Sequence, residues 1–183
     1  DSVFDDCSGL TSINVETGNT IYDSRNNCNA IIETATNTLI TGCKNTTIPN
    51  SVTSIRDNAF WGCKGLTSIN IPDSVTSIGN WAFSGCTGLT SINIPDSVTD
   101  IGDSIFDGCE RLADIYCYAK KVPATNRYAF ADSYIRKATL HVPAASIEQY
   151  KATAPWSDFG TFLLLDETVL DRIQIDGIYY NLF

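Results

Sequence analysis

The stretch that decides the fold is LTSINIPDSVTSIGNWAFSGCTG, residues 66–88, which is followed directly by LTSINIPDSVTDIGDSIFDGCER, residues 89–111. The two segments are identical at 16 of 23 positions, and residues 43–65 match the first of them at 12 positions. Two residue types recur at this 23-residue spacing, at Phe60, Phe83 and Phe106 and at Cys63, Cys86 and Cys109. A fixed short period predicts a solenoid, in which stacked coils share one core.

Within one repeat, the apolar residues predict two short strands and a tight turn. Ile69 and Ile71 alternate with Ser68 and Asn70, as expected for a half-buried strand. A proline ends this strand, because it has no N–H for the ladder. Residues 75–78 alternate again and predict a second strand, and the Phe and Cys of each repeat fit a single helical or 3-10 turn. We therefore expect a mostly β fold of short parallel strands.

The residues that carry this pattern are Phe60, Cys63, Leu66, Ile69, Ile71, Pro72, Val75 and Ile78 with their 23-residue echoes. The pattern resembles the BspA-like, or treponemal-type, leucine-rich repeats of bacterial surface proteins. The resemblance covers roughly residues 1–166 and implies an extracellular protein at the bacterial cell surface. Some members of that family are implicated in adhesion to host proteins or to other bacteria.

The organisation around the repeats is less regular. We expect a leucine-rich-repeat solenoid over residues 1–143, with a β-hairpin insertion at about 16–44 and the clearest repeats at 43–112. The array opens in mid-repeat, at Phe4 and Cys7. Residues 144–166 resemble the α/β element that closes such arrays, and they predict a cap for the open face of the last coil. Residues 167–183 are expected to be a linker and the start of a further, truncated domain.

The outward residues of the first strands also form columns. The candidate binding surface consists of these columns together with two tryptophans at variable positions: Ser68, Asn70, Ser91, Asn93, Asp114, Tyr116, Trp61 and Trp81. Repeat proteins often bind on such a strand face, and Tyr and Trp are favoured in interfaces. The alternative is structural, because Ser and Asn columns keep a sheet soluble and a tryptophan can pack on the turn of a neighbouring coil.

Seven cysteines are present, and the repeating ones predict a ladder of buried, reduced thiols. A soft-metal site is not expected there, since metal ligands need a tetrahedral cluster and a column along the axis is linear. If Glu33 faces Thr38 in the hairpin, Cys28 faces Cys43, which makes them a candidate disulfide. The alternative is two thiols packed on the flank of the solenoid.

No catalytic, metal-binding or cofactor-binding residues are singled out, and no cofactor is expected. His141 is the one histidine, so neither a His-based triad nor a multi-His metal site can be assembled. No phosphate-binding glycine loop or CxxC occurs. The net charge of -9 argues against nucleic acid as a partner, and no apolar run is long enough for membrane insertion.

These observations predict a non-catalytic, surface-displayed protein-binding or adhesion module. The expected partner is a host or bacterial surface protein, and the chain is expected to be a monomer attached to the outer membrane through a segment outside this sequence. Two alternatives stay open. One is a glycan-binding module that uses Trp61, Trp81, Tyr116 and Tyr118 for stacking, and the other is a passive spacer in a larger surface protein.

Overall fold

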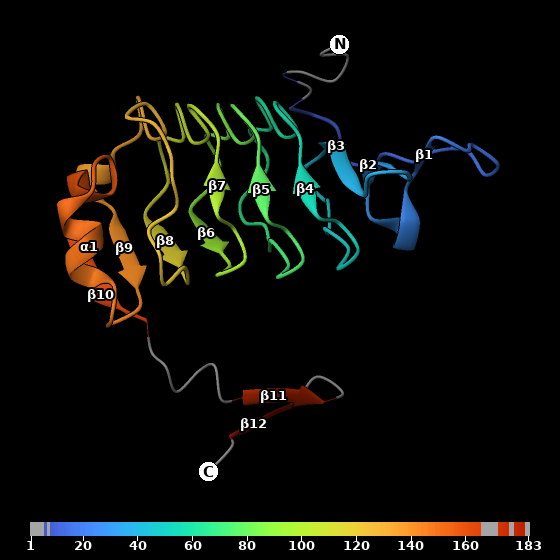
Figure 1. Ribbon diagram of the computed structural model, residues 1–183. Helices are drawn as coiled ribbons and strands as arrows, with labels where there is room; N and C mark the ends of the chain where they lie inside the picture. The colour runs from blue at the N-terminus through green and yellow to red at the C-terminus, as the bar shows by residue number, and fades with distance from the viewer. Residues whose placement is uncertain (1–5, 7, 166–171, 176–177, 182–183) are drawn as a thin grey trace.

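The computed structural model describes residue 6, residues 8–165 and the two strands at 172–175 and 178–181 (Figure 1). Within these ranges the protein is mostly β, with one α-helix, α1 (Ile147–Ala152), and three 3-10 turns. Phe4 and Cys7, predicted to open the array, lie outside the described residues, as do residues 167–171 of the segment 167–183 that is predicted to be a linker and the start of a further domain. No helix in the described ranges has the length and apolarity needed to cross a membrane.

The second strand of each repeat contributes to the parallel part of a six-stranded sheet. Strands β3 (Thr38–Gly42), β4 (Ser54–Ile55), β5 (Ser77–Ile78) and β7 (Asp100–Ile101) lie side by side in that order. The register sets Ile55 beside Ile78 and Ile78 beside Ile101, which is the predicted spacing. Their side chains are buried, so the alternation in residues 75–78 was interpreted correctly.

The first strands form a second parallel sheet, ordered β6 (Ser91–Ile94), β8 (Asp114–Cys117), β9 (Thr139–Val142) and β10 (Thr161–Leu164). The strand predicted at residues 66–71 is reduced to an isolated bridge between Asn70 and Asn93. The preceding repeat supplies no neighbour for it, because the chain turns at Lys44 and Asn45 and the N–H of Cys43 bonds to Thr46 Oγ1 at 2.7 Å. A segment with a neighbour on one side only makes fewer ladder bonds.

The tight turns stack as predicted and bury the phenylalanine column. The rings of Phe60 and Phe83 are 5.1 Å apart, those of Phe83 and Phe106 5.8 Å, and those of Phe106 and Phe130 5.6 Å. Backbone bonds join neighbouring turns, for example from Phe60 N–H to the Ala82 carbonyl at 2.8 Å. The core is therefore continuous from one repeat to the next, which a single flat coil could not achieve alone.

The repeating cysteines lie in the same turns and are buried free thiols. The Cys86 thiol donates to the Phe60 carbonyl at 3.1 Å, and the Cys109 thiol donates to the Phe83 carbonyl at 3.2 Å. Burial raises the pKa of Cys63 to about 11 and that of Cys109 to about 12, and it also raises the pKa of Cys86. Cys86 and Cys109 thus each satisfy a carbonyl of the preceding repeat, and burial disfavours the charged form of all three thiols.

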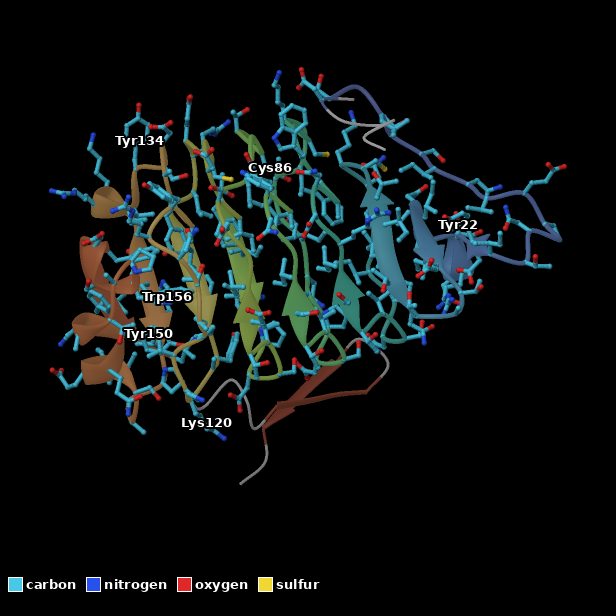
Figure 2. All side chains as sticks on the ribbon, turned by 45° about the horizontal axis from the view of Figure 1, so that its top comes forward. Tyr22, Cys86, Lys120, Tyr134, Tyr150 and Trp156 are labelled. Atoms are coloured by element: carbon cyan, nitrogen blue, oxygen red, sulfur yellow. The ribbon has the colours of Figure 1, made fainter. Side chains whose placement is uncertain are left out.

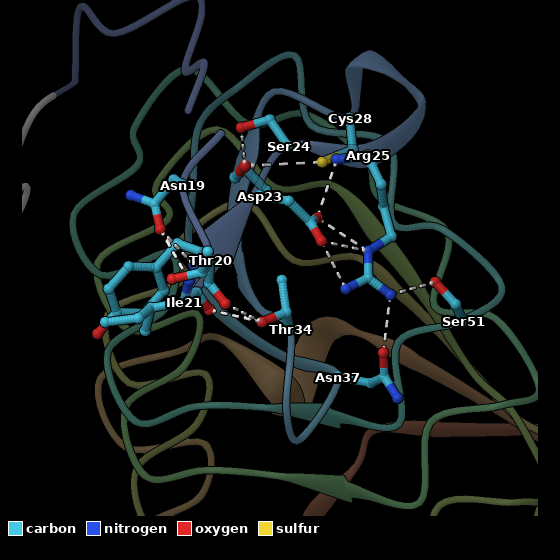
Figure 3. A network of polar contacts seen from close by, with 12 residues as sticks. Asn19, Thr20, Ile21, Asp23, Ser24, Arg25, Cys28, Thr34, Asn37 and Ser51 are labelled. Carbon is cyan, nitrogen blue, oxygen red and sulfur yellow. Dashed lines mark hydrogen bonds and ion pairs between the residues drawn. The ribbon is translucent and has the colours of Figure 1, made fainter. Parts of the chain in front are cut away.

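The insertion contains β1 (Tyr22–Asp23), the 3-10 turn Arg25–Asn27 and β2 (Ala30–Glu33), with β2 antiparallel to β3. Arg25 anchors it to the first repeat (Figure 3), because its guanidinium pairs with Asp23 at 2.7 Å and also bonds Asn37 Oδ1 at 2.7 Å and Ser51 Oγ at 3.3 Å. Figure 2 shows Tyr22 in this insertion, on the side of the molecule opposite to Tyr150 and Trp156.

The hairpin register corrects the argument for a disulfide between Cys28 and Cys43. Glu33 does pair with Thr38, but a register shift between Ile31 and Ile32 brings Ala30 opposite Gly42. The extra residue moves Cys43 out of line with Cys28 and toward Asn29, whose carbonyl lies 3.5 Å from Cys43 Sγ. Both cysteines are buried free thiols in this structure.

After β9 the chain folds over the last phenylalanine of the column. Trp156, in the 3-10 turn Trp156–Asp158, packs edge-on against Phe130 with ring centroids 5.3 Å apart. Phe159 also packs edge-on against Phe130, with ring centroids 5.1 Å apart. Tyr150 from α1 is fully buried and donates its hydroxyl to the Ala119 carbonyl at 2.9 Å. Figure 2 shows Tyr150 and Trp156 together at this end of the molecule. Strands β11 (Arg172–Ile175) and β12 (Ile178–Asn181) form a separate antiparallel pair.

Candidate functional site

The outward residues of the second sheet form two columns across its strands. Register sets Ser91 beside Asp114 and Asp114 beside Thr139. The other column runs through Asn93, Tyr116, His141 and Leu163. The side-chain character therefore changes along the sheet, from small and polar near β6 to aromatic and apolar near β10.

Three strands bring together the residues that we call the strand-face cluster: Asp114, Tyr116, His141 and Leu163. The rings of Tyr116 and His141 stack with centroids 4.1 Å apart and an interplanar angle of 14°. His141 Nε2 lies 2.9 Å from Asp114 Oδ1, and the imidazole is only 14% exposed. Leu163, beside His141 in register, is 50% exposed. The cluster is thus a flat aromatic and apolar area with a carboxylate at its margin.

Sequence reasoning placed Asp114 and Tyr116 in the candidate surface but treated His141 as an ordinary polar surface residue. The strand alternation had already set His141 on the outward side, between the inward Leu140 and Val142. What the sequence could not supply was the register, because the repeat loosens after Cys109. His141 lies beside Tyr116 in register, which is 25 residues earlier in the chain and not the 23 of the regular repeats.

Tyr118, directly after the end of β8, is a second tyrosine near the cluster. Its backbone N–H donates to the Ile94 carbonyl at 2.9 Å. Burial raises the pKa of Tyr118 above its ordinary value, and the neighbouring Tyr116 hydroxyl adds to that effect. Both tyrosines are partly buried. Aromatic rings held in place lose little side-chain entropy when a partner covers them.

The other predicted strand-face residues line a shallow, polar depression of about 190 Å³, formed by Ser68, Asn70, Ser91 and Asn93. Ser68, Asn70 and Asn93 are exposed and Ser91 is half-buried. The structure therefore places all six predicted outward residues on one sheet face, and it divides them into a polar part and the strand-face cluster.

The two predicted tryptophans lie elsewhere, in the turns that follow the second strands. Trp61 is 39% exposed and Trp81 is 43% exposed. Trp81 has a φ of 53°, at the position held by Asn58 (φ 59°) and Ser104 (φ 52°) in the neighbouring repeats. Asn accepts this left-handed conformation readily, whereas for a bulky residue it is strained. Sequence spacing could not reveal this strain.

The described residues contain no group of three or more His, Cys, Asp or Glu side chains that could hold a metal ion. The arrangement of the strand-face cluster is suited to contact binding, since its two aromatic rings are partly exposed on the outward face of the sheet beside the half-exposed Leu163. Its one acid and one histidine are paired with each other at 2.9 Å.

Comparison with known proteins gives one family match. The model of the BspA type leucine rich repeat region matches residues 32–151 in six copies. No curated protein matches the chain.

Several solved structures are similar to this chain. A leucine-rich repeat protein from Eubacterium ventriosum is 23% identical with a TM-score of 0.65, over 90% of this chain and 45% of that one. A T. pallidum leucine rich repeat protein is 31% identical over 52% of this chain and 44% of that one, with a TM-score of 0.47. A leucine rich cell surface protein from Faecalibacterium prausnitzii is 24% identical over 88% and 43%, also with a TM-score of 0.47. The chain spans less than half the length of each of these proteins.

Proposed function

We propose, on the premise that this chain belongs to the BspA-type leucine-rich repeat family, that it is a non-catalytic module that binds a protein partner at the bacterial cell surface. The partner is a host protein or a surface protein of another bacterium, so that the module serves adhesion. Attachment to the outer membrane, through a segment outside this sequence, is part of the proposal.

The observation that carries the proposal is the strand-face cluster. Aromatic residues are enriched where proteins bind one another, and charged residues are depleted at interface centres. Tyr116 and His141 are already stacked at 4.1 Å, so they would not have to be ordered on binding. Leu163, half-exposed beside them, extends the apolar area, and the polar depression near β6 would form part of a rim.

The organisation proposed with this function is one solenoid over residues 1–143, closed by a cap at residues 144–166. Support for the cap comes from Trp156 and Phe159, which cover Phe130 at the end of the phenylalanine column. An open coil end would otherwise expose a large apolar face and favour self-association, so we propose that the chain is a monomer. Residues 167–183 are proposed to be a linker and the start of a further domain.

A glycan partner is the second candidate, favoured by the exposed Trp61 and Trp81, which offer flat aromatic faces for stacking. A passive spacer, with binding done by another domain, is the third. The glycan candidate also draws on Tyr116 and Tyr118 for stacking, so a sugar array distinguishes it from the main proposal, whereas the spacer needs none of these residues.

The test is binding of the full chain to a panel of purified host extracellular proteins and bacterial surface proteins, measured by biolayer interferometry. We expect saturable binding to at least one protein, weakened at least tenfold by Tyr116→Ala combined with His141→Ala. The matched control is Thr76→Ala, at an exposed position directly before β5 of the other sheet. Binding that survives the double substitution would move the site away from the cluster, and a panel with no binder would favour the spacer.

A further inference from the structure

We propose a second binding site, for a neutral oligosaccharide, in the polar groove that runs across β4, β5 and β7 on the first sheet. The groove has a volume of about 390 Å³ and lies on strands that do not contribute to the strand-face cluster. Its lining combines Ser54, Ser77, Arg56, Asp57, Asn80 and Asp100 with two glycines. The proposal is independent of the protein partner proposed above.

The floor of the groove is made of small residues and stays open for that reason. Ser54 and Ser77 pair across β4 and β5, with their hydroxyl oxygens 2.9 Å apart. Gly79 and Gly102 follow the second strands, and a Cβ on Gly79 would lie 2.3 Å from Asp57 Oδ1. Because the glycines have no Cβ, side chains of the preceding repeat can lie against them, and these side chains form the wall of the groove.

That wall is a ladder of side chains held in place by the next repeat. Asp57 Oδ1 accepts the Asn80 N–H at 2.7 Å, and Asn80 Oδ1 accepts the Asp103 N–H at 2.8 Å. The Asn80 amide nitrogen lies 3.5 Å from Asp57 Oδ2, so its second hydrogen and the remaining lone pairs of Asp57 are available to a ligand. Oriented carboxylate and amide groups suit recognition of vicinal hydroxyls, because such groups can bond two of them at once.

Trp81 supplies the apolar element that such a ligand needs. It follows Asn80 directly in the chain, its side chain is 43% exposed, and its φ of 53° is a conformation that costs a bulky residue free energy. The flanking repeats place Asn and Ser at this position, so the fold itself does not call for tryptophan. Trp81 does not itself line the groove, but it follows the lining residue Asn80 directly in the chain. A ligand long enough to extend past Asn80 would stack on this exposed aromatic residue.

The charge of the groove and the spacing of its lining residues restrict the class of ligand. The charged lining residues are one arginine and two aspartates, in a chain of net charge -9, so uronic or sulfated glycans would be repelled. The residues that line the groove recur from strand to strand at a spacing of about 4.8 Å. This spacing is close to that of successive sugars in an extended chain. A neutral oligosaccharide lying across the strands fits both conditions.

The test is titration of the ¹⁵N-labelled full chain with hexasaccharides of glucan, mannan, xylan and chitin, with a heparin hexasaccharide as the anionic probe. We expect saturable shifts of the Ser54, Ser77 and Asn80 amides with at least one neutral sugar and none with heparin. Trp81→Asn and Asp100→Ser copy residues that the adjacent repeats already carry, so both variants should fold. Each should weaken sugar binding, Trp81→Asn by about tenfold or more from the lost stacking.

The matched control is Trp61→Ser, which also copies a neighbouring repeat and removes the other exposed tryptophan without touching the groove. Sugar binding should be unchanged in this variant, and protein binding at the strand-face cluster should be unchanged in Trp81→Asn. The proposal is overturned if no neutral hexasaccharide shifts the groove amides, if Trp81→Asn and Asp100→Ser bind as tightly as the native chain, or if the heparin probe binds best.

Discussion

Tyr116 and His141, from neighbouring parallel strands, stack on the outward face of the sheet with their ring centroids 4.1 Å apart. Because Asp114 Oδ1 lies 2.9 Å from His141 Nε2, the imidazole is held from its edge as well as from its face. A pair restrained in this way is preorganised for contact with a partner. The same two strands carry the buried Ile115 and Leu140 on the opposite face, so the fold itself supports the cluster from below.

The phenylalanine column is expected to contribute strongly to stability. Phe83 is fully buried and stacks between Phe60 and Phe106, so Phe83→Ala should lower the free energy of unfolding by about 3–5 kcal/mol through lost transfer free energy and the cavity left behind. Urea denaturation followed by tryptophan fluorescence measures this change, with Thr76→Ala as the exposed control. A loss below about 1 kcal/mol would show that Phe83 is not in the core.

The three repeating thiols and the thiol of Cys117 in β8 should resist modification in the folded protein. Cys63, Cys86, Cys109 and Cys117 are buried, and burial raises the pKa of each of them, so little reactive thiolate forms at neutral pH. Labelling with a thiol reagent should be slow before denaturant is added and rapid afterwards. Prompt labelling of all four in the native protein would contradict their placement.

The same thiols predict a loss of stability at alkaline pH. Their ordinary pKa is 9.0, whereas in the folded chain Cys63 and Cys117 titrate at about 11 and Cys109 at about 12. Above pH 9 these thiols ionise in the unfolded chain before they ionise in the folded chain, so the folded state loses stability as the pH rises. Below pH 9 the thiols are protonated in both states, and their full contribution to the free energy of unfolding is present. The urea midpoint should be lower at pH 10.5 than at pH 7, and the difference between the two midpoints should be smaller in Cys109→Ala than in the native chain. Equal pH dependence in the two proteins would exclude Cys109 as a cause.

The end of the phenylalanine column should depend on Trp156. This residue is fully buried, meets Phe130 at 5.3 Å and donates from Nε1 to the Pro123 carbonyl at 3.3 Å. Trp156→Ala should lower stability by about 3–5 kcal/mol and raise the tendency to self-associate, as measured by calorimetry and light scattering. The control is Lys151→Ala, at an exposed position of α1. A monomeric variant with unchanged melting would count against the proposed cap.

The sequence was sufficient for the strands and columns of the regular repeats, because Phe, Cys, Ile and Leu recur there at a fixed interval. It failed where the interval changes: Phe130 comes 24 residues after Phe106, so the register of His141 against Tyr116 could not be derived. One extra residue in β3 likewise moved Cys43 away from Cys28. Asp57 and Asn80 also lie 23 residues apart, but the bond between them was missed because Asp and Asn are common in turns for local reasons and do not by themselves indicate a contact between repeats.

The most direct test of the central claim is a map of the amides that change when the labelled chain binds the protein partner found in the panel. Binding through the strand-face cluster predicts that the largest ¹H–¹⁵N shifts fall on Asp114, Tyr116, His141 and Leu163, and that Tyr116→Ala with His141→Ala abolishes them. Shifts confined to the turns around Trp61 and Trp81, with the cluster amides unmoved, would contradict the account.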